Sequence, residues 1–335
     1  MATIHDVAKM AGVSPSTVSL AFSNPGRVSD DKLERIRKAA EAVGYAADPI
    51  AQSLRSGRSR LIGLVAASIG NPFHTTMLSE LESYAVANGY FVVIVDSAGF
   101  QAQERALIDA LIGLRVAGVV LGPSGFDLPY AHYIRDLNIP IVSFDHKIEG
   151  MERDFVGSDN RLATAMLTEH LLQLGHRRIA FISGKETFYT AIERKRGFYE
   201  TMAGAGVEID ESLVVNGRYE GDVAYAHTMR LMTRPDRPTA IIGANNDMAL
   251  AALKAIQELG FHCPDQISLA MVDDVPWSSV ITPKLTMVVQ NPVELGQLAA
   301  QRILHRIMSR EAAAEPARDF ILTPRFVPGA SCKPL

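Results

Sequence analysis

The strongest constraint on the fold is a regular alternation of strand and helix patterns over residues 61–290. Short hydrophobic runs typical of buried strands occur at 61–67, 90–96, 117–122, 139–145, 178–183, 239–244, 267–273 and 285–290. Longer stretches with helical periodicity separate most of them, at 74–88, 101–114, 161–174, 191–205, 221–232 and 246–259. This serial β-α-β order predicts a doubly wound α/β architecture, with a mostly parallel sheet and helices on both faces.

The α/β part is too long for one sheet with one core. About 275 residues exceed a comfortable single core, so we expect two similar lobes within residues 60–335. The first lobe is predicted to hold about 60–158 and 288–318, and the second about 159–287 and 319–330. A helix at 293–310 would return to the first lobe, and the final strand to the second.

The first 47 residues carry a different pattern, of short helices joined by tight turns. Thr3 stands three residues before an aspartate, the spacing of a capping box, and Gly12 is placed to end the first helix. Ser14 followed by Pro15 is typical of a second helix start, and a third helix follows. So tight a turn between two short helices predicts an all-α helix-turn-helix domain at 1–47. The spacing alone also fits a plain three-helix bundle.

The second helix would be the one that reads DNA. Outward positions near its start are small or apolar, namely Pro15, Ser16, Thr17, Ser19 and Leu20. Ser16 can hydrogen-bond a base edge and Leu20 can contact a thymine methyl group. Thr17 and Ser19 can reach phosphates, and Thr3 completes the DNA-binding set predicted for this domain.

The charge of the chain is uneven. Residues 1–60 carry nine Lys and Arg against six Asp and Glu, a net charge of +3. The remaining residues carry a net charge of −7, which gives −4 for the whole chain. A basic end on an acidic body favours a polyanionic partner for that end, such as nucleic acid. A solvated helical domain fits the same charge.

Residues 48–59 are predicted to form a hinge helix or linker between the two parts. A helix this short is marginal alone in water, so we expect it to fold when docked. Leu54 can enter a minor groove as a wedge that kinks the duplex, with Ala51 and Arg55 beside it on the DNA. The alternative is an ordinary amphipathic linker whose leucine packs on its own protein.

Polar and aromatic residues gather where the predicted strands end. In doubly wound folds ligands bind beyond the carboxyl ends of the strands, and two lobes would bring these ends together across a cleft. The predicted effector-binding set is Asn71, Phe73, Asp145, Asp159, Thr190, Arg194, Tyr219, Asn245, Asp273 and Asn291, with His146 and Trp277 as further candidates.

This set suits a sugar or a similar polyol. Arg194 and Asp273 can grip vicinal hydroxyls through charge-assisted hydrogen bonds, while Phe73 and Tyr219 can pack on a ring. Structural alternatives exist for several members. Phe73 also fits a core position, Arg194 a solvated helix face, and the Asp and Asn residues fit loop or helix caps.

The sequence carries no recognisable catalytic or metal-binding motif. It lacks a glycine-rich phosphate cradle, a nucleophile elbow and a His-Glu-x-x-His pair. The two cysteines, Cys263 and Cys332, and nine scattered histidines do not form a metal-ligand pattern. We therefore expect no enzyme activity, no catalytic residue, no cofactor and no metal.

The expected compartment is the cytoplasm. The N-terminus lacks the apolar region of a signal peptide, and no apolar run reaches the roughly 18 residues that a spanning helix needs. We expect no membrane partner.

Three segments together carry a family resemblance: TIHDVAKMAGVSPSTVS, NPGRVSDDKLERIRKAAEAVGY and PIAQSLRSGRSRLIGLV. They resemble the LacI/GalR (lactose/galactose repressor) family in register from residue 3 to about 65, and family-like segments continue to about residue 330. The resemblance implies a helix-turn-helix domain before a two-lobed core like that of periplasmic binding proteins. It places Pro15, Ser16 and Leu20 at operator-discriminating positions and Leu54 at the hinge-helix leucine.

The resemblance also implies a function. Effector-pocket positions fall on Phe73, Asp145, Arg194, Tyr219, Asn245 and Asp273. We expect a homodimeric repressor that reads near-palindromic operator DNA and responds to a small-molecule effector, most simply a sugar. No leucine heptads follow 318–327, which favours a dimer over a tetramer. A solute-binding receptor and a sugar-modifying enzyme are the alternatives, and the missing signal peptide and catalytic motifs argue against them.

Overall fold

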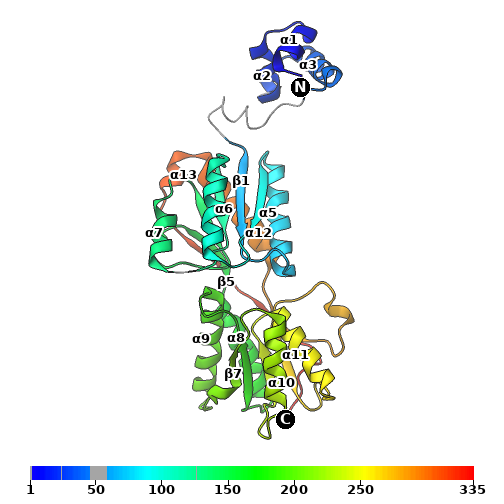
Figure 1. Ribbon diagram of the computed structural model, residues 1–335, viewed down its shortest axis with the longest axis vertical. Coiled ribbons are helices and arrows are strands. Elements are labelled where there is room, and N and C mark those ends of the chain that lie inside the picture. Colours follow the sequence, from blue (N-terminus) through cyan, green and yellow to red (C-terminus); the bar gives the residue numbers. More distant parts are fainter. Residues whose placement is uncertain (1, 24, 46–58, 126) are drawn as a thin grey trace. The chain divides into compact units, whose positions relative to one another are not determined.

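The computed structural model describes residues 2–23, 25–45, 59–125 and 127–335. These residues form two units, 1–61 and 62–335 (Figure 1). In the first, the described residues up to 45 form helices joined by turns, and the second contains two β-sheets flanked by helices. The predicted fold class, an all-α N-terminal domain before a two-lobed α/β core, is confirmed.

The N-terminal unit contains the helices α1 Ile4–Ala11, α2 Pro15–Ser23 and α3 Asp30–Val43, with the 3-10 turn η1 Pro25–Arg27. They share a small apolar core of Val7, Ala8, Ala11, Val18, Ala21, Ile36, Ala39 and Ala40. The capping box is present, since Thr3 Oγ1 accepts from Asp6 N at 3.4 Å and the Asp6 carboxylate accepts from Thr3 N at 2.8 Å. Gly12, at φ 64°, then ends α1 in the left-handed conformation.

The first sheet of the larger unit has six strands in the order β11-β5-β4-β3-β1-β2. Their bounds are β1 Leu61–Ala66, β2 Phe91–Asp96, β3 Gly118–Leu121, β4 Ile141–Phe144, β5 Asp154–Ser158 and β11 Asp319–Leu322. The helices of this first lobe are α5 Pro72–Ala87, α6 Gln101–Gly113, α7 Leu128–Asp136, α12 Pro292–Met308 and α13 Arg310–Ala314. Helix α12 packs on β3, β4 and β5 and along α5. Gly296 permits this approach, because a Cβ there would lie 2.3 Å from the carbonyl oxygen of Met77.

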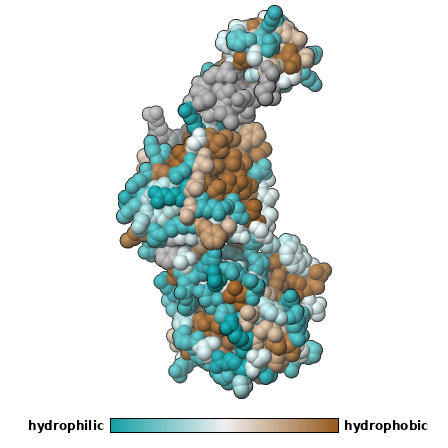
Figure 2. All heavy atoms as spheres, in the orientation of Figure 1, coloured by the Kyte–Doolittle hydropathy of each residue, from teal (hydrophilic) through white to brown (hydrophobic). Residues whose placement is uncertain are grey.

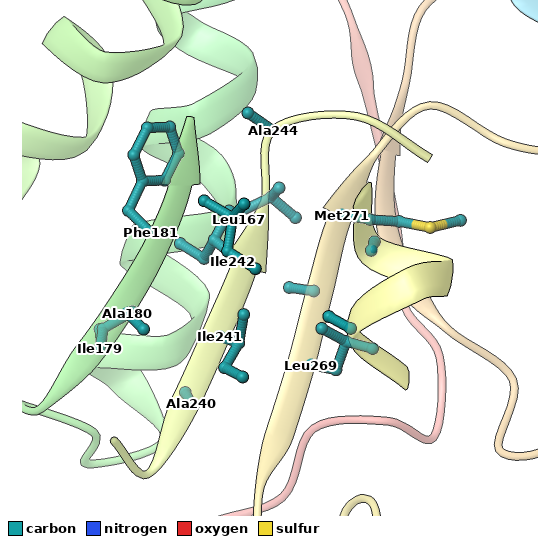
Figure 3. Close-up of a cluster of buried hydrophobic side chains, with 14 of the residues drawn as sticks. Leu167, Ile179, Ala180, Phe181, Ala240, Ile241, Ile242, Ala244, Leu269 and Met271 are labelled. Atoms are coloured by element: carbon teal, nitrogen blue, oxygen red, sulfur yellow. The ribbon is translucent and has the colours of Figure 1, made fainter. Parts of the chain in front are cut away.

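The second sheet also has six strands, in the order β12-β10-β9-β8-β6-β7. Their bounds are β6 Ile179–Ser183, β7 Val214–Asn216, β8 Ala240–Gly243, β9 Ser268–Val272, β10 Thr286–Val289 and β12 Arg325–Val327. Its helices are α8 Asn160–Gln173, α9 Tyr189–Gly204, α10 Gly221–Met232 and α11 Asn246–Glu258, with the 3-10 turns η2 Glu211–Leu213 and η3 Ser278–Val280. Figure 3 shows part of its core, in which Phe181, Ile242 and Leu269 come from three neighbouring strands.

One predicted boundary is wrong. Residues 319–322 were expected in the second lobe, but β11 pairs in parallel with β5 at the edge of the first sheet. The chain has just left α12 and α13 on that lobe, so the nearest open edge is β5. It crosses only afterwards, and β12 then pairs antiparallel with β10 in the second sheet.

The structure also contains β5, β7 and α7, which the hydrophobic pattern did not predict. Strand β5 escapes the pattern because Asp154 and Ser158, polar residues at its two ends, are buried. The charge of Asp154 can be buried in this strand because Arg306 and Arg302 bind its carboxylate, at 2.5 and 2.9 Å. The hydrophobic pattern of the sequence does not predict such ion pairs.

Candidate functional site

The start of α2 is held by a hydroxyl network. Ser14 Oγ lies 2.9 Å from Ser16 Oγ and 2.8 Å from Thr17 Oγ1, and it accepts from Thr17 N at 3.2 Å. Ser16 is exposed, whereas Pro15, Thr17, Ser19 and Leu20 are half-buried. Arg35 on α3 donates from Nη2 to Ala11 O at 2.5 Å, which fixes the turn between α1 and α2. These contacts give α2 a defined start, with the predicted DNA-reading residues around its first turns.

Three members of the predicted DNA-binding set, Ala51, Leu54 and Arg55, lie outside the described residues. The side chain of Thr3 forms hydrogen bonds in the capping box of α1. The roles of all these residues on DNA stay predictions.

Eight of the ten predicted effector residues line one cavity of about 390 Å³ in the larger unit. They come from both lobes: Asn71, Phe73 and Asp145 from the first, and Thr190, Arg194, Tyr219, Asn245 and Asp273 from the second. The cavity volume lies within the range of small-molecule sites. The strand ends meet there because parallel strands direct their carboxyl ends to one edge of each sheet.

Asp159 and Asn291 do not reach this cavity. Both cap helices: Asp159 Oδ1 accepts from Leu162 N at 2.9 Å at the start of α8, and Asn291 Oδ1 accepts from Glu294 N at 3.2 Å at the start of α12. These residues were selected because ligands bind beyond the carboxyl ends of the strands, and a helix start often follows a strand end directly. We call this selection the strand-end rule. Trp277, a further candidate, is half exposed and also lies off the cavity wall.

A carboxylate between two imidazoles forms the first-lobe wall. Asp145 Oδ2 accepts from His74 Nε2 at 3.2 Å and lies 3.3 Å from His146 Nε2. Burial alone would raise the pKa of Asp145, but His146, His74 and Arg194 outweigh it and hold that pKa well below its usual range. Asp145 is therefore an ionised acceptor inside the cavity.

The surroundings shift the pKa values of the two imidazoles in opposite directions. Both ring nitrogens of His74 face acceptors, since Nδ1 lies 2.8 Å from Ser68 O and Nε2 faces Asp145. Burial opposes protonation of His74, but these acceptors outweigh it and raise its pKa. Burial lowers the pKa of His146 to about 4, so His146 is neutral at physiological pH.

Arg194 and Asp273 form the wall on the second lobe. Arg194 donates from Nε to Asn160 Oδ1 at 2.7 Å and from Nη1 to Ala244 O at 2.5 Å. Its Nη2 lies 3.9 Å from Asp273 Oδ2, beyond hydrogen-bond distance, so that edge of the guanidinium and that oxygen are both positioned for a ligand. Arg194 is thus a buried, fixed donor and not a solvated helix residue.

Aromatic rings close the cavity around these polar groups. Phe73, Phe100, Phe188 and Tyr219 line it, and the rings of His146 and Phe188 lie 4.7 Å apart across the two lobes. Tyr219 Oη bonds Thr190 Oγ1 at 2.9 Å. Flat faces beside fixed polar groups are the features by which proteins hold ring-shaped polar ligands.

Backbone strain concentrates at the same cavity. Five described cavity residues other than glycine have positive φ angles, namely Ala98 (50°), Asp145 (59°), Arg218 (59°), Tyr219 (60°) and Asp273 (72°). Asp145 and Asp273 follow β4 and β9 directly. Such conformations are unfavourable for these residue types and collect at functional sites, where they direct side chains inward.

Sequence analysis missed several lining residues. His74, Phe188, Lys185 and Gln290 all face the cavity, and His146 was only a further candidate. Gln290 follows β10 immediately, so the strand-end rule could have selected it. The signal for His74 and Phe188 is absent, because only the fold brings them beside Asp145 and His146.

Two other features of the described chain bear on function. Nowhere in the described ranges do three His, Cys, Asp or Glu side chains gather so that they could hold a metal ion. Among the helices that the structure describes, none is both long and apolar enough to cross a membrane.

Comparison with known proteins identifies the family. The family model for bacterial regulatory proteins of the lacI family matches residues 3–48, and that for a periplasmic binding protein-like domain matches 168–332. A probable transcriptional repressor named ExuR from Bacillus subtilis is 31% identical, covering 94% of both chains. The chain belongs to the LacI family. This confirms the resemblance seen in the sequence, and the chain is a DNA-binding transcriptional regulator.

Other LacI-family relatives span the chain as fully. A transcriptional repressor named PurR from Vibrio campbellii is 30% identical, covering 98% of this chain and 97% of its own. The structure of the lac repressor dimer bound to operator and the anti-inducer ONPF is 25% identical, with a TM-score of 0.87 and 99% of each chain covered.

Proposed function

We propose that this LacI-family regulator is a cytoplasmic homodimeric repressor whose affinity for a near-palindromic operator is set by a sugar bound in the cavity. The observation that carries the proposal is the cavity wall. It combines a fixed guanidinium, two buried carboxylates and aromatic faces, a set suited to a polyhydroxylated ring.

Operator reading is assigned to α2 and the linker. In this proposal Ser16 and Leu20 contact base edges, Thr17, Ser19 and Arg55 contact the backbone, and Leu54 enters the minor groove at the operator centre. The exposed Ser16 and the tight hydroxyl network at the start of α2 support close approach of this helix to DNA.

The uncovered edge of the first sheet supports a dimer. Strand β2 is an edge strand, and it exposes Phe91 and Ile94 beside the exposed Val86 on α5. Figure 2 shows hydrophobic atoms gathered on this lobe. A two-fold dimer through this edge would present two copies of α2 to two operator half-sites.

Chain association tests the dimer. Phe91→Lys is expected to shift the protein from dimer to monomer in light scattering after size-exclusion chromatography. Leu128→Lys is the matched control, because Leu128 is as exposed as Phe91 but lies on α7. A dimer unaffected by Phe91→Lys, or lost equally in both variants, would contradict this interface.

Operator binding in the presence of sugars tests the function itself. Fluorescence anisotropy with promoter DNA from the neighbouring genes is measured alone and with each member of a sugar panel. At least one sugar is expected to change the dissociation constant by roughly 5–150-fold, the usual range of such coupling. The result that contradicts the proposal is specific DNA binding that no sugar alters. Each sugar is also recovered afterwards, and its conversion would favour a sugar-modifying enzyme instead.

A further inference from the structure

The side chain of Asn71 joins the two lobes by hydrogen bonds. Asn71 precedes α5 in the first lobe, whereas Asn246 and Asp247 begin α11 in the second (Figure 1). Asn71 Nδ2 donates to Asn246 Oδ1 at 2.9 Å and to Asp247 Oδ2 at 3.1 Å. We call these three residues the clasp. An amide nitrogen carries two hydrogen atoms, so both donors of the Asn71 side chain are used inside the protein.

Backbone groups fix the orientation of both amides in the clasp. Asn71 Oδ1 accepts from Phe73 N at 3.0 Å and caps α5, which leaves Nδ2 directed to the second lobe. Asn246 is fully buried, its Oδ1 also accepts from Asp247 N at 2.7 Å, and its Nδ2 donates to Asp274 O at 3.3 Å. Because each lobe already holds its own partner in place, the contact between them orders few additional side-chain torsions.

The clasp lies where the cavity meets the surface. Asn71 and Asp247 line the cavity from opposite lobes, and Asp247 is exposed. Apolar side chains also pack between the lobes, since Ala67 of the first lobe forms a buried cluster with Phe188 and Ala191 of the second. Apolar contacts are not directional, whereas hydrogen bonds are. Separating the lobes would therefore break the two bonds of Asn71 and expose Ala67.

We propose that the clasp stabilises the arrangement in which the two lobes enclose the cavity. Its hydrogen bonds account for the place of Asn71 on the cavity wall, where the sequence predicted a contact with the effector. A ligand could accept either hydrogen of Asn71 Nδ2 only by breaking the clasp. This inference rests on the proposed function in one respect, because a change in the arrangement of the lobes should then change operator affinity.

Asn71→Asp removes the donor of the clasp and keeps the helix cap. Aspartate caps a helix as well as asparagine does, so the bond from Phe73 N is retained. The new carboxylate would face Asn246 Oδ1 and the Asp247 carboxylate, so attraction between the lobes becomes repulsion. Asn71→Asp combined with Asp247→Asn exchanges donor and acceptor, which restores a hydrogen bond between the lobes.

Asn291→Asp is the matched control. Asn291 caps α12 in the same way, since its Oδ1 accepts from Glu294 N at 3.2 Å, and its Nδ2 donates to Glu294 Oε2 at 2.9 Å. Both bonds stay within one helix of the first lobe. The control therefore loses the same kind of donor and gains the same charge without altering the contact between the lobes.

The experiment measures lobe separation by thiol labelling of the full chain, with no ligand added. Ala67→Cys provides the thiol, because Ala67 is 8% exposed and is covered by side chains of the second lobe. Its rate of reaction with dithiodipyridine, a neutral aromatic disulfide, reports how often the lobes separate. The native Cys263 and Cys332 are replaced by serine in every protein compared. Circular dichroism during urea unfolding gives the stability of each variant.

Asn71→Asp is expected to raise the labelling rate at least about tenfold, the effect of losing a hydrogen bond to a charged group. The variant that also carries Asp247→Asn should react at least about fivefold more slowly than Asn71→Asp alone, because the two positions are coupled. Asn291→Asp should react at the rate of the unmodified protein. An unchanged rate in Asn71→Asp, an equal rise in Asn291→Asp, or no recovery in the combined variant overturns the clasp. Asn71→Ser, which also keeps a cap, replaces Asn71→Asp if that variant unfolds.

Fluorescence anisotropy with promoter DNA from the neighbouring genes, again without sugar, separates this inference from the proposed function. Faster labelling of Asn71→Asp together with a changed dissociation constant for the DNA supports both. Faster labelling with an unchanged dissociation constant supports the clasp and refutes the coupling between the lobes and DNA that the proposed function requires. If the labelling rate of Asn71→Asp is unchanged, the clasp is wrong whatever the DNA measurement gives.

Discussion

Arg194 gives the sharpest test of the cavity, because it holds the fold together and is proposed to bind the ligand. Arg194 is 3% exposed, its guanidinium donates to Asn160 Oδ1 and Ala244 O, and its charge faces Asp273. Arg194→Met would leave two acceptors without donors and one buried carboxylate without its counter-charge. Breaking such a buried pair costs about 3–5 kcal/mol, a large part of the roughly 5–15 kcal/mol that stabilises a domain.

A double variant separates the fold from the ligand. Arg194→Met combined with Asp273→Asn removes both charges and keeps an acceptor for Gln290, which donates to Asp273 Oδ1 at 2.7 Å. Asparagine also tolerates the left-handed backbone that Asp273 adopts at φ 72°. We expect the double variant to regain about half of the stability lost by Arg194→Met, because it removes the unpaired buried charge but still leaves Asn160 Oδ1 and Ala244 O without their donors.

Effector affinity should not follow that recovery. Both variants are expected to bind the effector sugar at least tenfold more weakly, since each charge-assisted bond contributes about 1.5–3 kcal/mol. Urea unfolding followed by circular dichroism gives the stabilities, and calorimetry gives the affinities. A double variant no more stable than Arg194→Met would refute the charge argument. Unchanged sugar affinity in Arg194→Met would refute the cavity assignment.

Three further predictions concern DNA reading and stability. Leu54→Ala should weaken operator binding and reduce DNA bending in a gel-shift assay without changing sugar affinity. The loss of the inserted wedge should reduce the binding free energy by a few kcal/mol or less. Unchanged bending would contradict this prediction. Leu20→Gln should change the operator sequence recovered by in vitro selection, and recovery of the same sequence would remove α2 from the groove. Arg306→Met should cost about 3–5 kcal/mol, because Asp154 is fully buried, whereas Arg325→Met on the exposed surface should cost little. Burial alone would raise the pKa of Asp154, but Arg306 and the other donors outweigh burial and lower this pKa. The ionised Asp154 therefore stabilises the protein above the pKa of the unfolded state, and this stabilisation is lost as the pH falls through the pKa of the folded state. Acid unfolding monitored by circular dichroism should begin at higher pH in Arg306→Met.

The sequence predicts the architecture well because hydrophobic periodicity reports local burial. The alternation of strand and helix patterns leads directly to two parallel sheets, and the strand-end rule finds Asp145, Arg194 and Asp273. The rule cannot distinguish a residue that faces the cavity from one that caps the next helix. Asp159 and Asn291 are of the second kind, since their side chains bond backbone amides of their own helices.

Long-range pairing sets the other limit. Strand β5 looks too polar for a buried strand, because Asp154 is neutralised only by residues about 150 positions later in the chain. The cavity contains the same kind of dependence. His74 becomes a partner of Asp145 only once the fold brings the start of α5 to the end of β4, and Phe188 reaches His146 only across the two lobes. Local sequence patterns therefore do not predict these contacts.

Strand β1 runs from Leu61 towards the residues that line the cavity. It begins at Leu61, whose N bonds Ser59 Oγ at 3.1 Å, and beyond its other end Ala67 and Ser68 line the cavity. Its six residues span about 20 Å and pair with β3 inside the first sheet. The carbonyl of Ser68 accepts from His74, which in turn bonds Asp145. Asp145, His74, Ser68 and β1 therefore form a continuous series of contacts within the first lobe, which runs from the cavity to Leu61.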